Sequence, residues 1–438
     1  MTLAGLSIAY LRDRAMNTAL NVLLLTLGVA TMVILVLFST QLGERFQRDA
    51  QGIDLVVGAK GSPLQLILSS IYQVDAPTGN IPLETVENLR RDPTVRAVIP
   101  LALGDNFRGF RIVGTEPAYI DHYSGELAAG RRWRKPLETV IGSEVARRTG
   151  AAVGQKFLGS HGLDGGGDHD HEAAPFEVVG VLSPTGTVMD RLILTSVESV
   201  WDVHGLAHHS PADDGGLDHD AAHGELDGHD AQDHEHAGAP PAASQTPNAS
   251  TRLDHPEPEV TALLVKYRSA LAAVRLPAFI NKQTSLQAAA PAVEITRLMS
   301  LVGVGLDAMR GFAILLIVTS GLSIFVALYT ALRQREADMA MLRVMGATPR
   351  AIFGQILLEG LLLAGAGALL GLIVGHGVVA LAASTVAQLR DMGLTAARFE
   401  PAEIWIVLVA LAMGAFAALI PATKVFGVDI ADTLAHAR

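Results

Sequence analysis

The sequence predicts an α-helical membrane protein with four transmembrane helices in a one-plus-three layout and a large mixed α/β extracytoplasmic domain. Half of the 438 residues are hydrophobic and only 18% are charged, which is less charge than a soluble chain of this size normally carries. The apolar residues lie in four long uncharged runs, and the stretch between the first two runs is ordinarily polar. This distribution indicates helices in lipid.

The charge and composition exclude several classes of protein. The net charge of −11 argues against nucleic acid as a partner, because phosphate contacts require clustered Lys and Arg. The chain has no cysteine, so disulfides, thiolate metal sites and thiol nucleophiles are excluded. No G-x-x-x-x-G-K-[ST] motif occurs, and the Gly58–Ser62 stretch has the wrong spacing for one. We therefore expect a non-catalytic chain that does not itself hydrolyse ATP.

The four predicted spans are long enough to cross a bilayer. A hydrocarbon core about 30 Å thick takes about 20 apolar residues as a helix, and lipid tolerates only helices or closed barrels. We place the spans at residues 16–40, 306–332, 351–389 and 404–422. The first run is longer than the core of a signal peptide and lacks a clear cleavage site, which favours an uncleaved anchor.

Basic residues near the span ends predict the orientation. They precede the first span in residues 1–15, lie between the second and third spans in residues 333–350, and follow the fourth span in residues 423–438. We therefore expect a multi-pass inner-membrane protein with both termini and residues 333–350 in the cytoplasm. Residues 41–305 and the short loop 390–403 are then outside.

The outer region is expected to be mixed α/β. Turn-bounded apolar runs predict strands at residues 53–57, 97–103, 107–113, 176–182, 192–194 and 261–267, with a helix at 83–91. Before the second span an apolar stripe at spacings of three and four predicts a helix; it consists of Ile295, Leu298, Met299, Val302, Leu306 and Met309. A single helix over residues 16–50 would be about 50 Å long and would form a stalk with it. The alternative is two ordinary connectors.

Residues 333–350 combine apolar anchors with charges. Met339, Met341, Leu342, Val344 and Met345 form an adaptable apolar surface of the kind that docks in a partner's groove. Glu336, Arg343 and Arg350 can fix the register of such docking through ion pairs. Gly346 suits a helix C-cap and Pro349 suits the first turn of the next helix. The alternative is a connecting loop that is charged only to set topology.

Motifs in two parts of the chain carry a family resemblance. The segment begins R-Q-R-E at Arg333–Glu336, ends L-R-V-M-G-A at Leu342–Ala347, and leads into L-L-E-G at Leu357–Gly360. The chain closes with P-A-T-K at Pro421–Lys424, followed by V-D-I, where Ile430 stands at the family's usual proline. These motifs and the span layout resemble the FtsX/MacB-type permeases of ABC transporters, whose outer part is a MacB-like periplasmic core domain.

The resemblance implies a permease subunit that transmits ATP-driven motion to an extracytoplasmic substrate. The implied partners are an ABC ATPase subunit that alone binds ATP, a second permease copy in a homodimer, membrane lipid and an extracytoplasmic binding protein. The expected ATPase-coupling residues are Arg335, Glu336, Met341, Leu342, Arg343, Gly346, Ala347 and Pro349. One alternative is an FtsX-like regulator of a cell-wall hydrolase or binding protein. Another is a metal-sensing membrane receptor without an ATPase.

The third span contains small residues and two ionisable ones. Gly367, Gly371 and Gly375 are spaced by four, which creates a face for close helix packing in lipid. That face can serve a second subunit or packing within one subunit, and the sequence favours neither. His376 is either functional or hydrogen-bonded across helices. Glu359 can pair with an arginine of residues 333–350.

A histidine-rich insertion covers residues 204–258. Its candidate metal ligands are His208, His209, His219, His223, His229, His234 and His236, interleaved with Asp and Glu. Imidazole and carboxylate suit zinc, and imidazole also suits copper or nickel. The composition predicts disorder. Three interpretations remain: weak multi-site Zn²⁺ capture related to metal handling, a solvated acidic linker, and a pH-sensing element. No tightly bound cofactor is expected.

Overall fold

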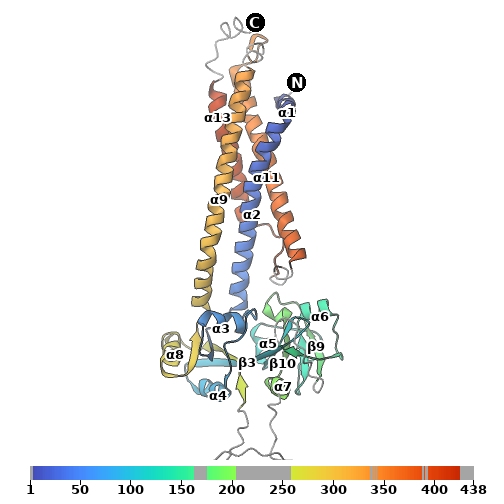
Figure 1. Ribbon diagram of the computed structural model, residues 1–438, viewed down its shortest axis with the longest axis vertical. Helices are drawn as coiled ribbons and strands as arrows, with labels where there is room; N and C mark the ends of the chain where they lie inside the picture. The colour runs from blue at the N-terminus through green and yellow to red at the C-terminus, as the bar shows by residue number, and fades with distance from the viewer. Residues whose placement is uncertain are drawn as a thin grey trace, which may run out of the picture. The chain divides into compact units, whose positions relative to one another are not determined.

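The computed structural model describes residues 3–161, 175–203, 258–335, 339, 341, 343–386, 389 and 393–424. The chain forms two compact units. One unit comprises Met1–Gln51 and Ala292–Arg438 and is helical, and the other comprises Gly52–Pro291 and contains the sheet (Figure 1). The predicted insertion at 204–258 lies outside the described residues except for Pro258.

The helical unit is a bundle of long helices. Its elements are α1 (Leu3–Asp13), α2 (Ala15–Asp49), α9 (Pro291–Gln334), α11 (Pro349–Thr385) and α13 (Pro401–Lys424). The last four are each long and apolar enough to cross a membrane. With the sheet unit between α2 and α9, they confirm the predicted one-plus-three order.

Helix boundaries follow local chemistry. Proline is the first residue of α9, α11 and α13, a position where its missing N–H is not needed. Thr348 caps α11, its side chain accepting from the Ala351 N–H at 3.3 Å. The third span was predicted to extend to residue 389, but α11 ends at Thr385. The predicted fourth span ended at residue 422, and α13 continues to Lys424.

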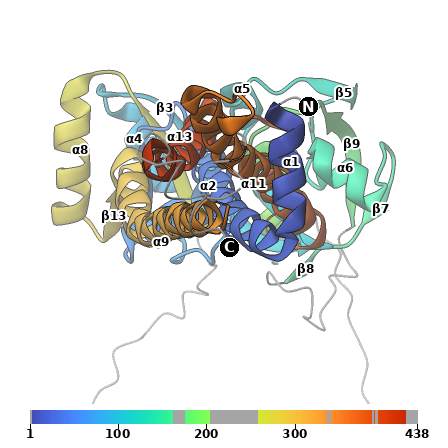
Figure 2. The same cartoon turned by 90° about the horizontal axis from the view of Figure 1, so that it is seen from above.

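Both α2 and α9 are unbroken along their whole length. They contain 35 and 44 residues, or about 52 Å and about 66 Å at 1.5 Å per residue. Both therefore exceed a bilayer core of about 30 Å. The bundle core is formed by apolar residues of α2, α9, α11 and α13, including Leu25, Val29, Ile317, Ala364 and Ala410. Figure 2 shows these helices end-on.

The sheet unit contains 11 strands in one sheet of the described residues. The main order is β13 (Leu286–Ala289), β1 (Leu55–Ala59), β12 (Ala262–Tyr267), β3 (Val95–Phe107), β4 (Phe110–Thr115), β10 (Ile193–Thr195), β6 (Glu138–Ile141), β9 (Phe176–Leu182) and β5 (Leu127–Gly130). Two short strands join it: β7 (Lys156–Phe157) pairs with β9, and β8 (Ser160–His161) with β3. A separate pair is formed by β2 (Ile81–Pro82) and β11 (Glu259–Val260).

Most pairs are antiparallel, and two are parallel. The parallel pairs are β10 with β4 and β6 with β9. The helices of this unit are α3 (Pro63–Ser70), α4 (Glu84–Arg91), α5 (Ala118–His122), α6 (Ser143–Thr149), α7 (Val197–Val203), α8 (Ala270–Gln283) and the 3₁₀ turn η1 (Val188–Arg191). Apolar side chains form two cores, one around β1, β3 and β12 and one around β4, β6, β9 and β10.

The predicted strands match the sheet closely, with one error. The stretch 107–113 was predicted as a single strand, but β3 ends at Phe107 and β4 begins at Phe110. Arg108 and Gly109 between them have φ of 51° and 81°. Two consecutive residues with positive φ are typical of a tight hairpin turn, and the apolar residues around them concealed this turn in the sequence.

Candidate functional site

The segment between α9 and α11 exposes apolar side chains. Met341, Val344 and Met345 are 58%, 66% and 70% exposed. Met339 instead is buried with Leu332 and Ile356. The segment therefore anchors itself by one methionine and leaves three apolar side chains on the surface.

The other predicted coupling residues lie in the same stretch. Gly346 has φ of 102°, a conformation that favours glycine, and it follows the helical residues 343–344. Ala347 is half-buried, Arg343 is half-buried, and Pro349 is the first residue of α11. Glu336 and Leu342 lie outside the described part of the chain.

Arg335 and Glu359 both line a small cavity at this end of the bundle, which we name the α1 end, but no ion pair or hydrogen bond joins them. The cavity, about 30 Å³, is lined by residues of α1, α9 and α11, including Tyr10, Gln355 and Glu359, and by Arg335 and Met339. The Arg335 guanidinium carbon lies 3.6 Å from the centre of the Tyr10 ring, a cation–π contact. Glu359 is 7% exposed, and the positive charges of Arg335 and Arg14 act on its carboxyl group.

The three glycines of the third span pack against α2 of the same chain. A Cβ at Gly367, Gly371 or Gly375 would lie 2.9, 2.6 or 2.9 Å from the side chain of Leu25, Val29 or Val33, respectively. The Thr26 hydroxyl also donates to the Gly367 carbonyl at 3.3 Å. Of the two alternatives for this face, the structure contains packing within one subunit.

A second close crossing joins α11 to α13. A Cβ at Gly360 would lie 2.6 Å from Ala418, and a Cβ at Gly414 would lie 2.4 Å from Ala364. This crossing was missed in the sequence analysis, although Ala410, Gly414 and Ala418 repeat every four residues in the way that marks such faces. Through these two crossings α11 is tightly packed on both α2 and α13.

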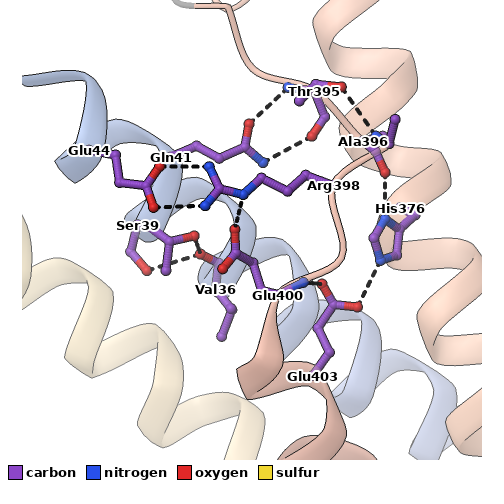
Figure 3. A network of polar contacts seen from close by, with 12 residues as sticks. Val36, Ser39, Gln41, Glu44, His376, Thr395, Ala396, Arg398, Glu400 and Glu403 are labelled. Carbon is purple, nitrogen blue, oxygen red and sulfur yellow. Dashed lines mark hydrogen bonds and ion pairs between the residues drawn. The ribbon is translucent and has the colours of Figure 1, made fainter. Parts of the chain in front are cut away.

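A polar network joins α2, α11 and α13 to residues 395–400, and we name it the loop network (Figure 3). His376 contacts the Ala396 carbonyl through Nδ1 at 2.7 Å and Glu403 Oε2 through Nε2 at 2.9 Å. The other oxygen of Glu403 accepts from the Glu400 N–H at 3.0 Å. Glu403 is completely buried.

The two contacts of His376 indicate where hydrogens lie on its ring nitrogens. Both ring nitrogens face oxygen acceptors, so Nδ1 carries a hydrogen for the Ala396 carbonyl, and a second hydrogen is shared between Nε2 and Glu403. The structure therefore contains the cross-helix hydrogen bonds that were one of the two alternatives for His376.

The exposed part of the loop network consists of an ion pair and of two hydrogen bonds made by the side-chain amide of Gln41. Arg398 donates to both oxygens of Glu44 at 2.6 and 2.8 Å, and its Nε lies 2.8 Å from Glu400. Hydrogen bonding to Glu44 raises the pKa of Arg398 above its usual value. Gln41 and Thr395 exchange two hydrogen bonds of 2.9 Å. These contacts were not predicted; the only signal was the presence of charges of both signs in residues 390–403.

The predicted metal ligands cannot be placed on this framework. His208, His209, His219, His223, His229, His234 and His236 all lie outside the described residues. Within the described residues, no group of three or more His, Asp or Glu side chains is arranged to hold a metal ion.

Comparisons with known proteins agree with this architecture. Residues 18–212 match the model of the MacB-like periplasmic core domain, and residues 310–430 match the model of the FtsX-like permease C-terminal region. No curated protein matches the chain. These two matches, together with the four apolar helices, place the chain in the FtsX/MacB-like family of ABC transporter permeases.

Two solved structures are also similar. The periplasmic region of MacB from Actinobacillus actinomycetemcomitans has 11% identity and a TM-score of 0.32, covering 57% of this chain and 95% of that chain. The extracellular domain of the noncanonic ABC-type transporter YknZ from Gram-positive bacteria has 13% identity and a TM-score of 0.28, covering 54% and 98%. At these TM-scores the family assignment rests on the family models.

Proposed function

We propose that this permease receives mechanical work at residues 333–350 from a separate ABC ATPase and transmits it to the Gly52–Pro291 domain. The observation that carries the proposal is the continuity of α9. It is one helix of 44 residues from the end of that domain to Gln334, immediately before the segment that exposes Met341, Val344 and Met345. A displacement of this segment therefore has an unbroken helical route to the domain.

The exposed methionines support the docking of a partner on this segment. Unbranched methionine side chains adapt to a groove, and short amphipathic helices bind soluble partners by such apolar anchors. Arg343, together with the predicted contribution of Glu336, would fix the register by charge. ATP would be bound and hydrolysed by the partner alone.

Packing of α11 supports transmission through a second route. Since α11 begins at Pro349, directly after the segment, and packs on α2 through Gly367, Gly371 and Gly375, movement of α11 would carry α2 with it. The domain is connected to α2 and α9 at its two ends, so both routes lead to it. Mechanotransmission of this kind needs no substrate channel through the helices.

The proposed homodimer must use a face other than the glycine face, which α2 already occupies. The predicted stripe on α9 is only half covered by the chain itself: Ile295, Leu298 and Val302 are half-buried, and the nearby Leu301 and Val304 are 63% and 72% exposed. We propose this part of α9 as the face that meets the second copy.

Charge reversal tests the ATPase contact. We expect Arg343→Glu and Met341→Asp to reduce recovery of an ABC ATPase with the tagged chain, extracted from native membranes, by about tenfold, the effect of losing one docking contact of about 1.4 kcal/mol. Arg132→Glu, an equal charge reversal in the sheet unit, should leave recovery unchanged. Undiminished recovery in both segment variants would refute the proposed docking site.

Cysteine labelling tests the orientation. The natural chain has no cysteine, so a single introduced cysteine reports its own location. A membrane-impermeant maleimide should label Glu87→Cys in intact cells after removal of any outer membrane. Thr348→Cys should be labelled only after the inner membrane is opened. The reverse pattern would place the segment outside and rule out an ATPase there.

A further inference from the structure

An apolar groove runs between α9 and α13. It has a volume of about 280 Å³ and is lined on α9 by Val318, Leu322 and Phe325 and on α13 by Met413, Phe416 and Ile420. Gly321 also lines it, and a Cβ there would lie 2.6 Å from Met413. The missing side chain allows Met413 to lie against α9. None of the lining side chains can hydrogen-bond strongly, so the groove suits a hydrocarbon.

The groove ends at a cluster of two cations around one tyrosine. Tyr329 follows Phe325 by one helical turn, and the two rings stack with centroids 5.9 Å apart. The Tyr329 hydroxyl oxygen accepts from Lys424 Nζ at 3.0 Å and from Arg333 Nη2 at 3.1 Å. Lys424 also lies 4.5 Å from the ring centre. Two like charges are thus close together on one neutral acceptor.

The spacing of these features fits one leaflet of a bilayer. Val318 and Tyr329 are separated on α9 by about 16 Å at 1.5 Å per residue, about half of a hydrocarbon core of about 30 Å. Arg333 and Lys424 lie at the ends of their helices, beyond the apolar part. An acyl chain lying in the groove would therefore bring its headgroup to the two cations.

We propose that the groove and its cationic rim bind an anionic phospholipid. One acyl chain occupies the groove, and the phosphate accepts hydrogen bonds from Lys424 and Arg333, with Tyr329 holding both in place. A phosphate between the two cations relieves their mutual repulsion and gains charge-assisted hydrogen bonds. A helix of a second copy is the alternative occupant of the groove, and the oligomeric state of the groove variant below distinguishes it from lipid. The site depends on the membrane location of the chain and not on the ATPase.

Lipid titration of the purified full chain tests the site. Bound lipids would be counted by native mass spectrometry after addition of phosphatidylglycerol or of phosphatidylcholine with the same acyl chains. We expect tighter binding of phosphatidylglycerol, and about a fivefold loss of its affinity in Lys424→Gln, the effect of one basic residue near a lipid surface. Lys424→Arg should retain the affinity. Glycerol 3-phosphate, which has the phosphate without the chains, should not compete.

A matched pair of variants tests the groove. Leu322→Trp fills it and should weaken both lipids, whereas Val326→Trp, on the exposed surface of α9 outside the groove, should weaken neither. Equal binding of the two lipids by the natural chain, or unchanged binding in Lys424→Gln, would overturn the proposal. So would a Leu322→Trp variant that turns from dimer to monomer with unchanged lipid binding, because a second copy would then be the occupant.

Discussion

The two ends of the helical bundle each bury a glutamate, but their bonding differs. In the loop network, Glu403 is completely buried and both of its oxygens have partners. At the α1 end, Glu359 is also buried and makes no hydrogen bond or ion pair within the described residues. Nη2 of its neighbour Arg335 is likewise buried without a hydrogen bond to any described residue.

The difference indicates which end is fixed and which can change. A buried charge without hydrogen bonds is unfavourable, so the α1 end gains from any rearrangement that supplies partners. In the loop network Glu403 already has hydrogen bonds to both of its oxygens, and these bonds are lost if the network moves. The same end that has unmet polar groups also exposes Met341, Val344 and Met345, as expected for a surface that another protein completes.

Replacing each glutamate by alanine should give the largest difference in stability between the two ends. Glu403→Ala leaves His376 and the Glu400 N–H without their buried partner and should lower the free energy of unfolding by about 3 kcal/mol. Glu359→Ala deletes the same atoms but breaks no hydrogen bond to a described residue, so its loss should be about 1 kcal/mol or less. Thermal unfolding of the purified variants in one detergent measures both. Equal losses would mean that burial alone, and not bonding, distinguishes the two ends.

The glycine face of α11, which packs against α2, should be sensitive to added side-chain volume. Gly371→Val places its Cβ 2.6 Å from Val29, and overpacking of this kind should destabilise the chain by about 1–3 kcal/mol. Gly377→Val carries the same change on the same helix, at a position where no described atom lies within 4 Å of the Cβ site. The two variants share their helix propensity, so the difference in unfolding temperature isolates the α2 contact. If Gly377→Val is as harmful, the contact with α2 is not what makes Gly371 necessary.

The sequence predicted the elements far better than the contacts between them. An uncharged run of twenty residues specifies a spanning helix whatever its neighbours are, and a turn-bounded apolar run was enough to locate β9 at Phe176–Leu182. Likewise, Gly371 indicated a close-packed face but not its partner, because the four-residue spacing of small residues does not determine which helix lies opposite. Arg398 and Glu44 are 354 positions apart, and nothing local to either residue points to the other.

A carboxylate in the sheet unit shows how bonding controls stability in water. Glu138 accepts from Arg131 at 2.6 and 2.7 Å and from the Arg134 N–H at 2.8 Å. These bonds, chiefly the Arg131 pair, lower the pKa of Glu138 from 4.5 to about 2. A lowered folded-state pKa stabilises the fold above the unfolded value, and this stability is lost as the pH falls from about 4.5 to about 2.

Glu138→Gln should therefore remove part of the acid sensitivity of this unit. Fluorescence of the buried Trp133 and Trp201 follows its unfolding in the full chain between neutral pH and pH 2. We expect the variant to be slightly less stable at pH 7 and to approach the natural chain at the acid end of the range. A constant difference across the range would show that the Glu138 carboxylate does not titrate as its bonds predict.

The Arg398–Glu44 pair should have the smallest effect, although its geometry is as good as that of Arg131 and Glu138. Both side chains are more than 40% exposed, and exposed pairs contribute little because water and salt screen them. Glu44→Ala, which breaks this pair but keeps the contact of Arg398 with the buried Glu400, should leave the unfolding temperature nearly unchanged at physiological salt and lower it slightly at low salt, where screening is weak. A large, salt-independent loss would mean that Glu44 holds Arg398 in place against the buried Glu400. The rigid part of the loop network would then extend to the surface of the chain.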